Sequence, residues 1–197
     1  MCIRDSLLAG HETTSNALAW AFYLLTQNPE ADGRMRAELR DVLGDRPPEA
    51  SDLDRLVYTE AIVKETMRLY PPAFVLARRA AVDTQIDRFT IPRGSEVILW
   101  IYFTHRDPNV FPDPERFDPT RFLDGREAAI PKCGYLPFGA GPRACIGKTF
   151  AMAEATIAVA TIAQRARFEY AGRKPPRPRG RITLTPGGGV PVRVLRP

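Results

Sequence analysis

The chain has 197 residues and a net charge of +5, with 44% hydrophobic and 26% charged residues. This composition is typical of a globular domain and excludes a disordered or fibrous chain. Its three cysteines form no CxxC pair and have no disulfide-like spacing, which argues against a zinc site and against a disulfide-rich secreted scaffold. The longest apolar runs, such as residues 18–25, are too short to cross a bilayer, so the sequence predicts no membrane segment.

The first third of the chain predicts three helices, over residues 7–27, 29–43 and 52–69. Asn28 followed by Pro29 ends the first helix and opens the second, because proline is tolerated in a first helical turn but not in a helix interior. A polar, proline-rich loop over 44–51 precedes the third helix, and the double proline Pro71-Pro72 terminates it.

The rest of the chain predicts short strands and one more helix. Strands are expected over 84–91 and 96–100, on either side of a turn at Pro92–Gly94. A long loop over 106–137 precedes a helix over 146–164, and residues 181–195 alternate like a β-hairpin around Gly187–Gly189. The expected fold class is therefore mainly α with small β-sheets.

Basic residues gather near the C-terminus, in the segment Gly172–Arg181. Such a segment can bind nucleic acid or an anionic membrane, or contribute to a docking face for an acidic electron-transfer partner. No aromatic residues interleave with these cations to stack on bases, which favours a solvated, proline-stiffened connection between two strands. We therefore predict no nucleic-acid partner.

The segment Phe138–Gly147, FGAGPRACIG, carries the strongest chemical signal. Its glycines permit tight backbone paths and the close approach of a flat partner. Cys145 stands at the start of a predicted helix, with the cation Arg143 two residues upstream, and both features favour a thiolate. A single thiolate offered from a loop suits an axial ligand to the metal of a large flat cofactor. The alternative is a small buried cysteine without chemistry.

Four motifs in order resemble the cytochrome P-450 haem-thiolate monooxygenases. The cysteine segment fits the pattern Phe-Gly-x-Gly-x-Arg-x-Cys-x-Gly without departure, and AGHETT (9–14), ETMR (65–68) and PERF (114–117) precede it. The resemblance covers residues 7–197 and implies the C-terminal part of that fold. That part comprises the second half of the long central helix, the ExxR helix, the meander loop, the cysteine loop and the following helix.

The resemblance implies haem b (iron protoporphyrin IX) as the cofactor, with Cys145 as the axial ligand of its iron. Phe138 would pack near the sulfur, beside Gly139, while Ala9 and Gly10 would flank the oxygen pocket. Contacts to the haem propionates are implied for Arg78, His105 and Arg143, with Arg79 as an adjacent alternative to Arg78. For His105 the residues alone favour a loop histidine that makes local hydrogen bonds.

Glu12 and Thr13 place an acid and an alcohol side by side on the first predicted helix. Such a pair can pass protons to a reacting oxygen. The alternative is an ordinary polar stripe on the helix. The resemblance implies a catalytic role, in which Thr13 orients dioxygen and water and Glu12 is its acid partner.

Glu65 and Arg68 are three residues apart on a predicted helix and can pair. In isolation this spacing favours a weak surface ion pair. Apolar neighbours suggest instead a buried pair, with Arg116 of PERF as a third member. The resemblance implies a structural triad of Glu65, Arg68 and Arg116 that supports the cysteine loop.

The resemblance implies a monooxygenase that uses dioxygen and electrons from a ferredoxin- or flavoprotein-type redox partner to hydroxylate or epoxidise an apolar substrate. Val75 and Leu76 are the expected substrate-contacting positions. Two alternatives remain open, a truncated fragment without activity and a peroxide-using haem-thiolate enzyme. A bacterial, cytoplasmic protein is expected, although a membrane anchor upstream of the first motif stays compatible with the sequence.

The first six residues, MCIRDS, resemble the translation of a sequencing-library adapter. We therefore expect residues 1–6 to be non-native and residues 7–197 to form a partial cytochrome P-450 domain that lacks its N-terminal part. The alternative is a native start with Asp5 or Ser6 as the N-cap of the first helix.

Overall fold

The computed structural model describes residues 3–196, so Met1 and Cys2 of the predicted adapter-derived hexapeptide lie outside the described residues. The helices are α1 (Ile3–Gln27), α2 (Pro29–Leu43), α3 (Val57–Leu69), α4 (Ile101–Thr104) and α5 (Lys148–Arg165). The 3-10 helices are η1 (Ala50–Arg55), η2 (Pro119–Phe122), η3 (Arg126–Ala129) and η4 (Gly141–Arg143). The strands are β1 (Leu76–Arg79), β2 (Thr84–Ile86), β3 (Phe89–Ile91), β4 (Glu96–Leu99), β5 (Arg167–Tyr170), β6 (Arg177–Gly180), β7 (Leu184–Gly187) and β8 (Val192–Leu195).

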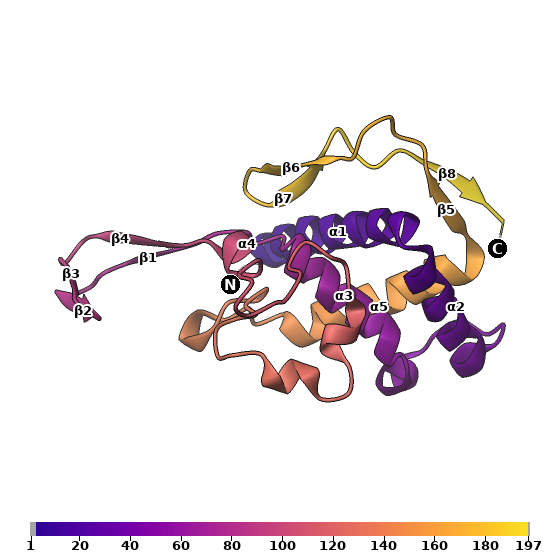
Figure 1. Ribbon diagram of the computed structural model, residues 1–197, viewed down its shortest axis with the longest axis horizontal. Helices are drawn as coiled ribbons and strands as arrows, with labels where there is room; N and C mark the ends of the chain where they lie inside the picture. Colours follow the sequence, from indigo (N-terminus) through magenta and orange to yellow (C-terminus); the bar gives the residue numbers. More distant parts are fainter. Residues whose placement is uncertain (1–2, 197) are drawn as a thin grey trace.

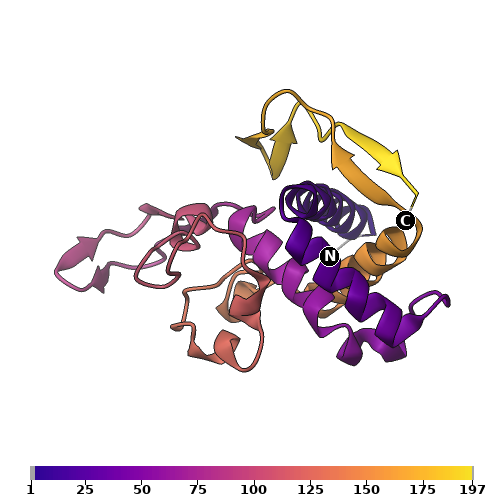
Figure 2. The ribbon, with the colours of Figure 1, turned by 45° about the vertical axis from the view of Figure 1, so that its right-hand side comes forward.

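The core lies where α1, α3 and α5 pack together, and the C-terminal strands cover the other side of α1 (Figures 1 and 2). Trp20 of α1 is fully buried and stacks on Tyr70, with ring centroids 3.7 Å apart. Ile62 and Val159 bring the buried faces of α3 and α5 to the same cluster. Burial of such large apolar groups is the main stabilising term, at about 1.5–3 kcal/mol for each side chain. The fold is mainly helical with small sheets, as predicted.

The third helix begins later than the sequence suggested. The predicted helix over 52–69 is a 3-10 turn, η1, followed by α3 from Val57. Glu38 of α2 explains the new start, because its carboxylate accepts hydrogen bonds from the backbone N–H groups of Tyr58 and Thr59 at 2.6 and 2.8 Å. These groups have no partner inside the helix, so an acceptor from a distant segment fixes where α3 begins.

The predicted strand over 84–91 is wrong, because the chain reverses within it. β2 pairs with β3 across a turn at Asp87, whose φ of 52° lies in the left-handed region that aspartate tolerates. The strand after the Pro92–Gly94 turn, β4, pairs instead with β1, and places Arg78 opposite Val97. Figure 1 shows these two ladders as an arm that extends away from the helices.

The predicted C-terminal hairpin is also wrong. β7 pairs with β6 and β8 pairs with β5, so the two strands on either side of Gly188 and Gly189 belong to different sheets. Both glycines have positive φ, 85° and 80°, which allows the chain to pass from one sheet to the other. Within residues 3–196, no helix is both long and apolar enough to span a lipid bilayer.

Candidate haem-thiolate site

The cysteine loop is closed by its own backbone. The N–H of Cys145 donates to the carbonyl of Phe138 at 2.9 Å, and the N–H of Gly139 donates to the carbonyl of Leu136 at 3.0 Å. Gly139 and Gly141 have φ of 68° and 70°, a conformation that residues with side chains rarely adopt. The thiol of Cys145 is exposed, and α5 begins at Lys148, close behind it. The loop therefore presents one cysteine near a helix N-terminus, as predicted.

The surroundings of the thiol are apolar and open. Ile146 and Phe150 are 87% and 73% exposed, and a side chain at Gly139 would approach Leu76 of the β1 strand at 3.5 Å. Among residues 3–196, no three His, Cys, Asp or Glu side chains are grouped to hold a metal ion. A flat apolar cofactor matches the exposed apolar neighbours of the thiol.

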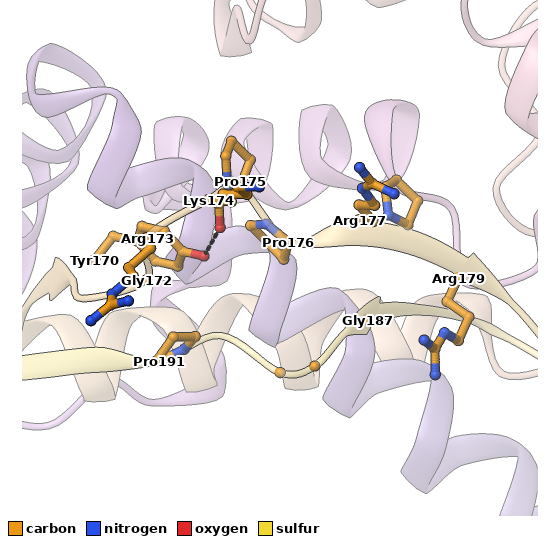
Figure 3. A pocket seen from close by; sticks show the side chains of 13 residues that line it. Tyr170, Gly172, Arg173, Lys174, Pro175, Pro176, Arg177, Arg179, Gly187 and Pro191 are labelled. Carbon is orange, nitrogen blue, oxygen red and sulfur yellow. Dashed lines mark hydrogen bonds between the residues drawn. The ribbon is translucent and has the colours of Figure 1, made fainter.

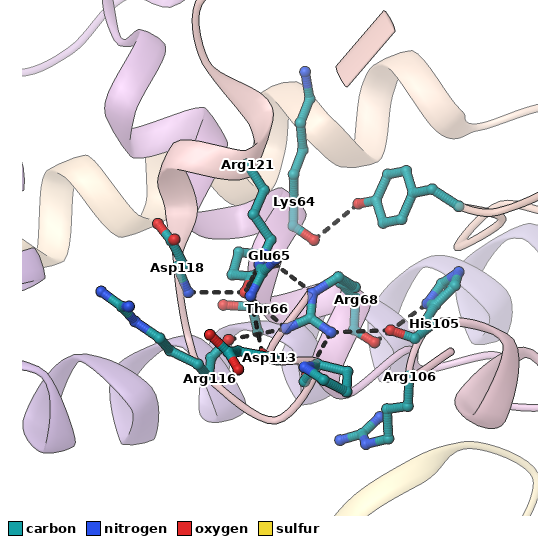
Figure 4. Close-up of polar contacts among 12 residues, drawn as sticks. Lys64, Glu65, Thr66, Arg68, His105, Arg106, Asp113, Arg116, Asp118 and Arg121 are labelled. Atoms are coloured by element: carbon teal, nitrogen blue, oxygen red, sulfur yellow. Dashed lines mark hydrogen bonds and ion pairs between the residues drawn. The ribbon is translucent and has the colours of Figure 1, made fainter. Parts of the chain in front are cut away.

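A fully buried ion pair lies behind this loop. Arg68 Nε and Nη2 donate to the two carboxylate oxygens of Glu65 at 2.7 and 2.8 Å, and both side chains are 0% exposed. The remaining donors reach the backbone carbonyls of His105, Pro114 and Arg116 at 2.9, 2.7 and 3.0 Å. Every N–H of the guanidinium is therefore used (Figure 4), which is what a buried arginine requires. Burial has the largest effect on the Glu65 carboxyl and raises its pKa, while Arg68 opposes that shift.

Arg121, not Arg116, supplies the third side chain. Arg116 contributes only its backbone carbonyl, and its exposed side chain points away from Arg68, whereas Arg121 reaches toward Glu65 (Figure 4). Arg121 Nε lies 3.5 Å from Glu65 Oε1, and its side chain is 12% exposed. The missed signal was Pro119–Phe122, PTRF, which repeats the Pro-x-Arg-Phe spacing of PERF shortly after it. The predicted triad is corrected to Glu65, Arg68 and Arg121.

This correction predicts unequal effects of two arginine substitutions. Arg121→Ala should lower the free energy of unfolding by about 1–2 kcal/mol, because it removes a partly buried cation from beside Glu65 and a donor to the Asp113 carbonyl. Arg116→Ala should change it by less than about 0.5 kcal/mol, because that side chain is exposed. Urea denaturation of both variants tests the assignment, and equal losses would contradict it.

His105 connects the buried pair to the cysteine loop. Its ring is 0% exposed, with Nδ1 at 3.2 Å from the carbonyl of Arg68 and Nε2 accepting from the N–H of Leu136 at 2.8 Å. The carbonyl of Leu136 in turn accepts a hydrogen bond from the N–H of Gly139 in the loop. Because both ring nitrogens are bonded to backbone groups, this geometry argues against the predicted propionate contact of His105. The histidine instead acts as a buried link between α3 and the loop.

The buried histidine predicts a loss of stability in mild acid. Burial lowers the pKa of His105 to about 4, from its ordinary value of 6.5, so the unfolded chain binds more protons between these pH values. Stability therefore falls as the pH drops, by about 2 kcal/mol from pH 7 to pH 5 for this residue. Urea denaturation at both pH values should show a shallower decrease in His105→Gln. The exposed His11→Gln variant is the control and should keep the full decrease.

The first four residues of the motif on α1, 9–12, are exposed. Ala9 and Gly10 are exposed, and a side chain added at Gly10 would meet no atom within 4 Å. Thr13 Oγ1 donates to the carbonyl of Ala9 at 2.6 Å, which leaves its oxygen free to accept a hydrogen bond. α1 continues through the motif as a regular helix. The open space at Gly10 fits the predicted oxygen pocket, whose role stays a prediction.

The motif of α1 and the helix after Cys145 are packed together. Thr14 Oγ1 donates to Glu154 Oε2 of α5 at 3.3 Å, so the two sequence motifs are joined by a side-chain contact. Glu12 contacts the C-terminal segment instead, where its Oε1 accepts from Thr183 Oγ1 at 2.6 Å. Sequence patterns gave no sign of either contact, since each joins residues more than a hundred positions apart.

The arginines predicted to hold propionates are exposed. Arg78 stands on β1, where Nη1 donates to the carbonyl of Ala77 at 2.9 Å, and Arg143 ends η4 within the cysteine loop. Leu76, at the start of the same strand, lies against Gly139, so β1 passes beside the loop. No contact of the described residues joins Arg78 to Arg143, and their propionate roles stay predictions.

A basic hollow of about 550 Å³ lies away from this site, among the C-terminal strands (Figure 3). Tyr170 Oη donates to the carbonyl of Lys174 at 2.6 Å across one end of it. The cations around it are Arg173, Lys174, Arg177 and Arg179. As predicted, this segment connects two strands, β5 and β6, although its residues 177–180 belong to β6 itself. No residue of the cysteine loop lines this hollow.

Comparison with known proteins identifies the arrangement. The family model described as Cytochrome P450 matches residues 1–190. The chain is 43% identical to cyclooctatin synthase of Streptomyces melanosporofaciens, over 96% of this chain and 40% of that relative. It is 44% identical to putative cytochrome P450 132 of Mycobacterium tuberculosis, over 94% of this chain and 40% of the relative. Human cytochrome P450 4V2 is 36% identical, over 96% of this chain and 37% of its own length.

The chain thus spans about 40% of the length of the first two of these relatives. Its α1 motif, buried Glu65–Arg68 pair and cysteine loop occur in the predicted order within one folded unit. The chain belongs to the cytochrome P450 family and has the fold of the C-terminal portion of that family's domain.

Proposed function

We propose that this chain carries the cofactor-holding and proton-delivering part of a haem-thiolate monooxygenase. The family implies a haem cofactor. The observation that carries the proposal is that Cys145 is exposed in a loop closed by backbone hydrogen bonds. The ring of His105 connects this loop to the backbone of the fully buried Arg68 by hydrogen bonds. A ligand held on so rigid a support keeps its position when a cofactor binds.

The donor set fits haem b. Cys145 would provide the axial thiolate, and the open apolar surface around Ile146 and Phe150 would contact the flat ring. Arg78 and Arg143 are exposed cations that would pair with the propionates. When bound, the haem supplies the activation of dioxygen that amino-acid side chains cannot perform.

Residues of α1 would deliver protons and keep the space next to the motif open. Thr13 has an oxygen that can accept a hydrogen bond, because its proton is already given to Ala9. Glu12 next to it is an acid that would hold and pass a proton to Thr13 or to water. The absence of a side chain at Gly10 keeps the adjacent space open.

An apolar organic substrate and a ferredoxin- or flavoprotein-type electron donor complete the proposal. Val75 and Leu76 are partly exposed and lead from the double proline into β1, beside the cysteine loop. Apolar side chains at these positions favour an apolar substrate. Cyclooctat-9-en-7-ol 5-monooxygenase of Streptomyces melanosporofaciens, 42% identical over 82% of this chain, is by its name an enzyme that adds one oxygen atom to its substrate.

A second candidate is a chain without activity of its own. Large apolar side chains are exposed around α4 and on α5, among them Trp100 directly before α4 at 50%, Phe103 of α4 at 63% and Phe150 of α5 at 73%. Exposed apolar side chains of this size favour aggregation unless a cofactor or another segment covers them.

The carbon-monoxide difference spectrum of the reduced chain, expressed with a haem supply, separates these candidates. A thiolate-type Soret band supports the proposed cofactor site, and a soluble chain without any haem band supports the inactive fragment. Turnover that requires dioxygen and a reductase supports the monooxygenase. Turnover with peroxide alone would assign the chain to the peroxide-using class.

A further inference from the structure

Thr183 joins the C-terminal strands to the acid of the α1 motif. It directly precedes β7, is 5% exposed, and its Oγ1 donates to Glu12 Oε1 at 2.6 Å. Asn16, one turn further along α1, donates from Nδ2 to the same Thr183 oxygen at 3.0 Å. A buried hydroxyl from a distant segment is thus placed between two side chains of one helix face.

The backbone around Thr183 fixes this position. The N–H of Leu184 donates to the carbonyl of Pro72 at 3.0 Å, and the indole of Trp20 donates to the carbonyl of Leu184 at 3.3 Å. Trp20 is fully buried in the core. The residue that follows the threonine is therefore bonded both to Pro72 and to α1, and Thr183 cannot move far from Glu12 without straining these bonds.

The direction of the hydrogen bonds is determined by the groups involved. An amide nitrogen such as Asn16 Nδ2 only donates, so the Thr183 hydroxyl accepts from it and has one proton left to give. That proton is donated to Glu12 Oε1, which fixes the orientation of the Glu12 carboxyl group. Proton transfer depends strongly on such orientation, because donor and acceptor must lie within hydrogen-bond reach.

We propose that Thr183 is a positioning residue for Glu12 and thereby sets the rate of proton transfer at the α1 motif. The effect on proton transfer rests on the proposed function, whereas the hydrogen bond between Thr183 and Glu12 is independent of it. The hydrogen bonds of the Thr183 side chain within the described residues go to Glu12 and Asn16, and of these two partners only Glu12 is an acid, so the proposed effect on proton transfer passes through Glu12.

A double-mutant cycle on thermal unfolding tests the contact without any cofactor. Thr183→Val and Glu12→Ala should each lower the Tm by about 2–4 °C, and the double variant should lose about as much as one of them. Thr185→Val is the matched control, because its hydroxyl donates to the carbonyl of Arg179 on the exposed part of the same strand pair. Its loss of Tm should add to that of Glu12→Ala. Additive losses for Thr183 and Glu12 would overturn the inference.

Reoxidation kinetics test the positioning role. The haem-loaded chain is reduced with dithionite and mixed with air-saturated buffer in H₂O or D₂O. Thr183→Val should slow reoxidation about tenfold and change the H₂O/D₂O rate ratio, because the proton donor is no longer held. Thr183→Ser should restore the rate to within about twofold, and Thr183→Val should have no further effect in a Glu12→Gln background.

The outcomes separate this inference from the proposed function. A lower Tm with unchanged rate and unchanged isotope ratio in Thr183→Val would assign the threonine a purely structural role and overturn the proposal. A chain without a haem band would overturn the proposed function, while coupling in the thermal cycle would still support the positioning of Glu12 by Thr183.

Discussion

Arg68→Ala should lower the free energy of unfolding by about 3–5 kcal/mol, the largest stability effect expected for a single change in this chain. The substitution leaves the carboxylate of Glu65, which is 0% exposed, without its main counter-charge. It also leaves the backbone carbonyls of His105, Pro114 and Arg116 without the hydrogen-bond donors that Arg68 supplies. Folded domains are stable by only about 5–15 kcal/mol, so the variant should be largely unfolded in mild urea. Urea denaturation followed by circular dichroism measures the loss.

Two companion variants show which property of Arg68 matters. Arg68→Lys keeps the charge but has only three donors, so it should still lose about 2 kcal/mol if the five-donor geometry is decisive. Replacing Glu65 and Arg68 together with leucine removes the unpaired charge but leaves the three carbonyls without donors, so stability should recover only in part. Full recovery in the double variant would contradict the importance of the backbone contacts.

Cys145→Ser should abolish the thiolate-type Soret band in the carbon-monoxide difference spectrum. A serine hydroxyl is not a thiolate and cannot give the spectral signature of a thiolate-bound iron. Any activity that depends on a thiolate-bound iron should be lost with the band. The spectrum is recorded on equal amounts of purified wild-type and variant chain.

Cys133→Ser is the matched control, because Cys133 is also an exposed free cysteine. It should keep the band. The Tm of the chain without haem should be nearly the same in both variants, since both side chains are exposed and little packing is lost. Loss of the band in Cys133→Ser, or its persistence in Cys145→Ser, would contradict the assignment of the ligand.

Local sequence signals predicted the elements whose ends depend on neighbouring residues. Asn28 and Pro29 separate α1 from α2 at the predicted position, because proline acts through its own ring and through the residue before it. The start of α3 was missed, because Glu38 of another helix accepts hydrogen bonds from its first turn. A second Pro-x-Arg-Phe makes Arg121 as good a candidate as Arg116 in the sequence, and only its position next to Glu65 in the folded chain selects it.

The strand pairings show the same limit. Alternating residues over 181–195 correctly indicated β-structure, yet β7 and β8 pair with different strands. The propensity of a strand is a property of its own residues, whereas its partner is chosen by side-chain contacts across the sheet and by what the sheet covers. Here the sheet must also place Leu184 against Trp20 and Pro72, which no local pattern can express.

The sequence by itself determined the family, the order of the motifs and the identity of Cys145 as the candidate ligand, because these are carried by short segments with specific chemistry. Only the tertiary structure decided that His105 links α3 to the cysteine loop, that Arg121 completes the buried triad and that Thr183 holds Glu12. Each of these roles depends on which atoms become neighbours after folding. Hydrogen bonds and buried ion pairs act over about 3 Å, so residues distant in sequence acquire their roles only when packing brings them together.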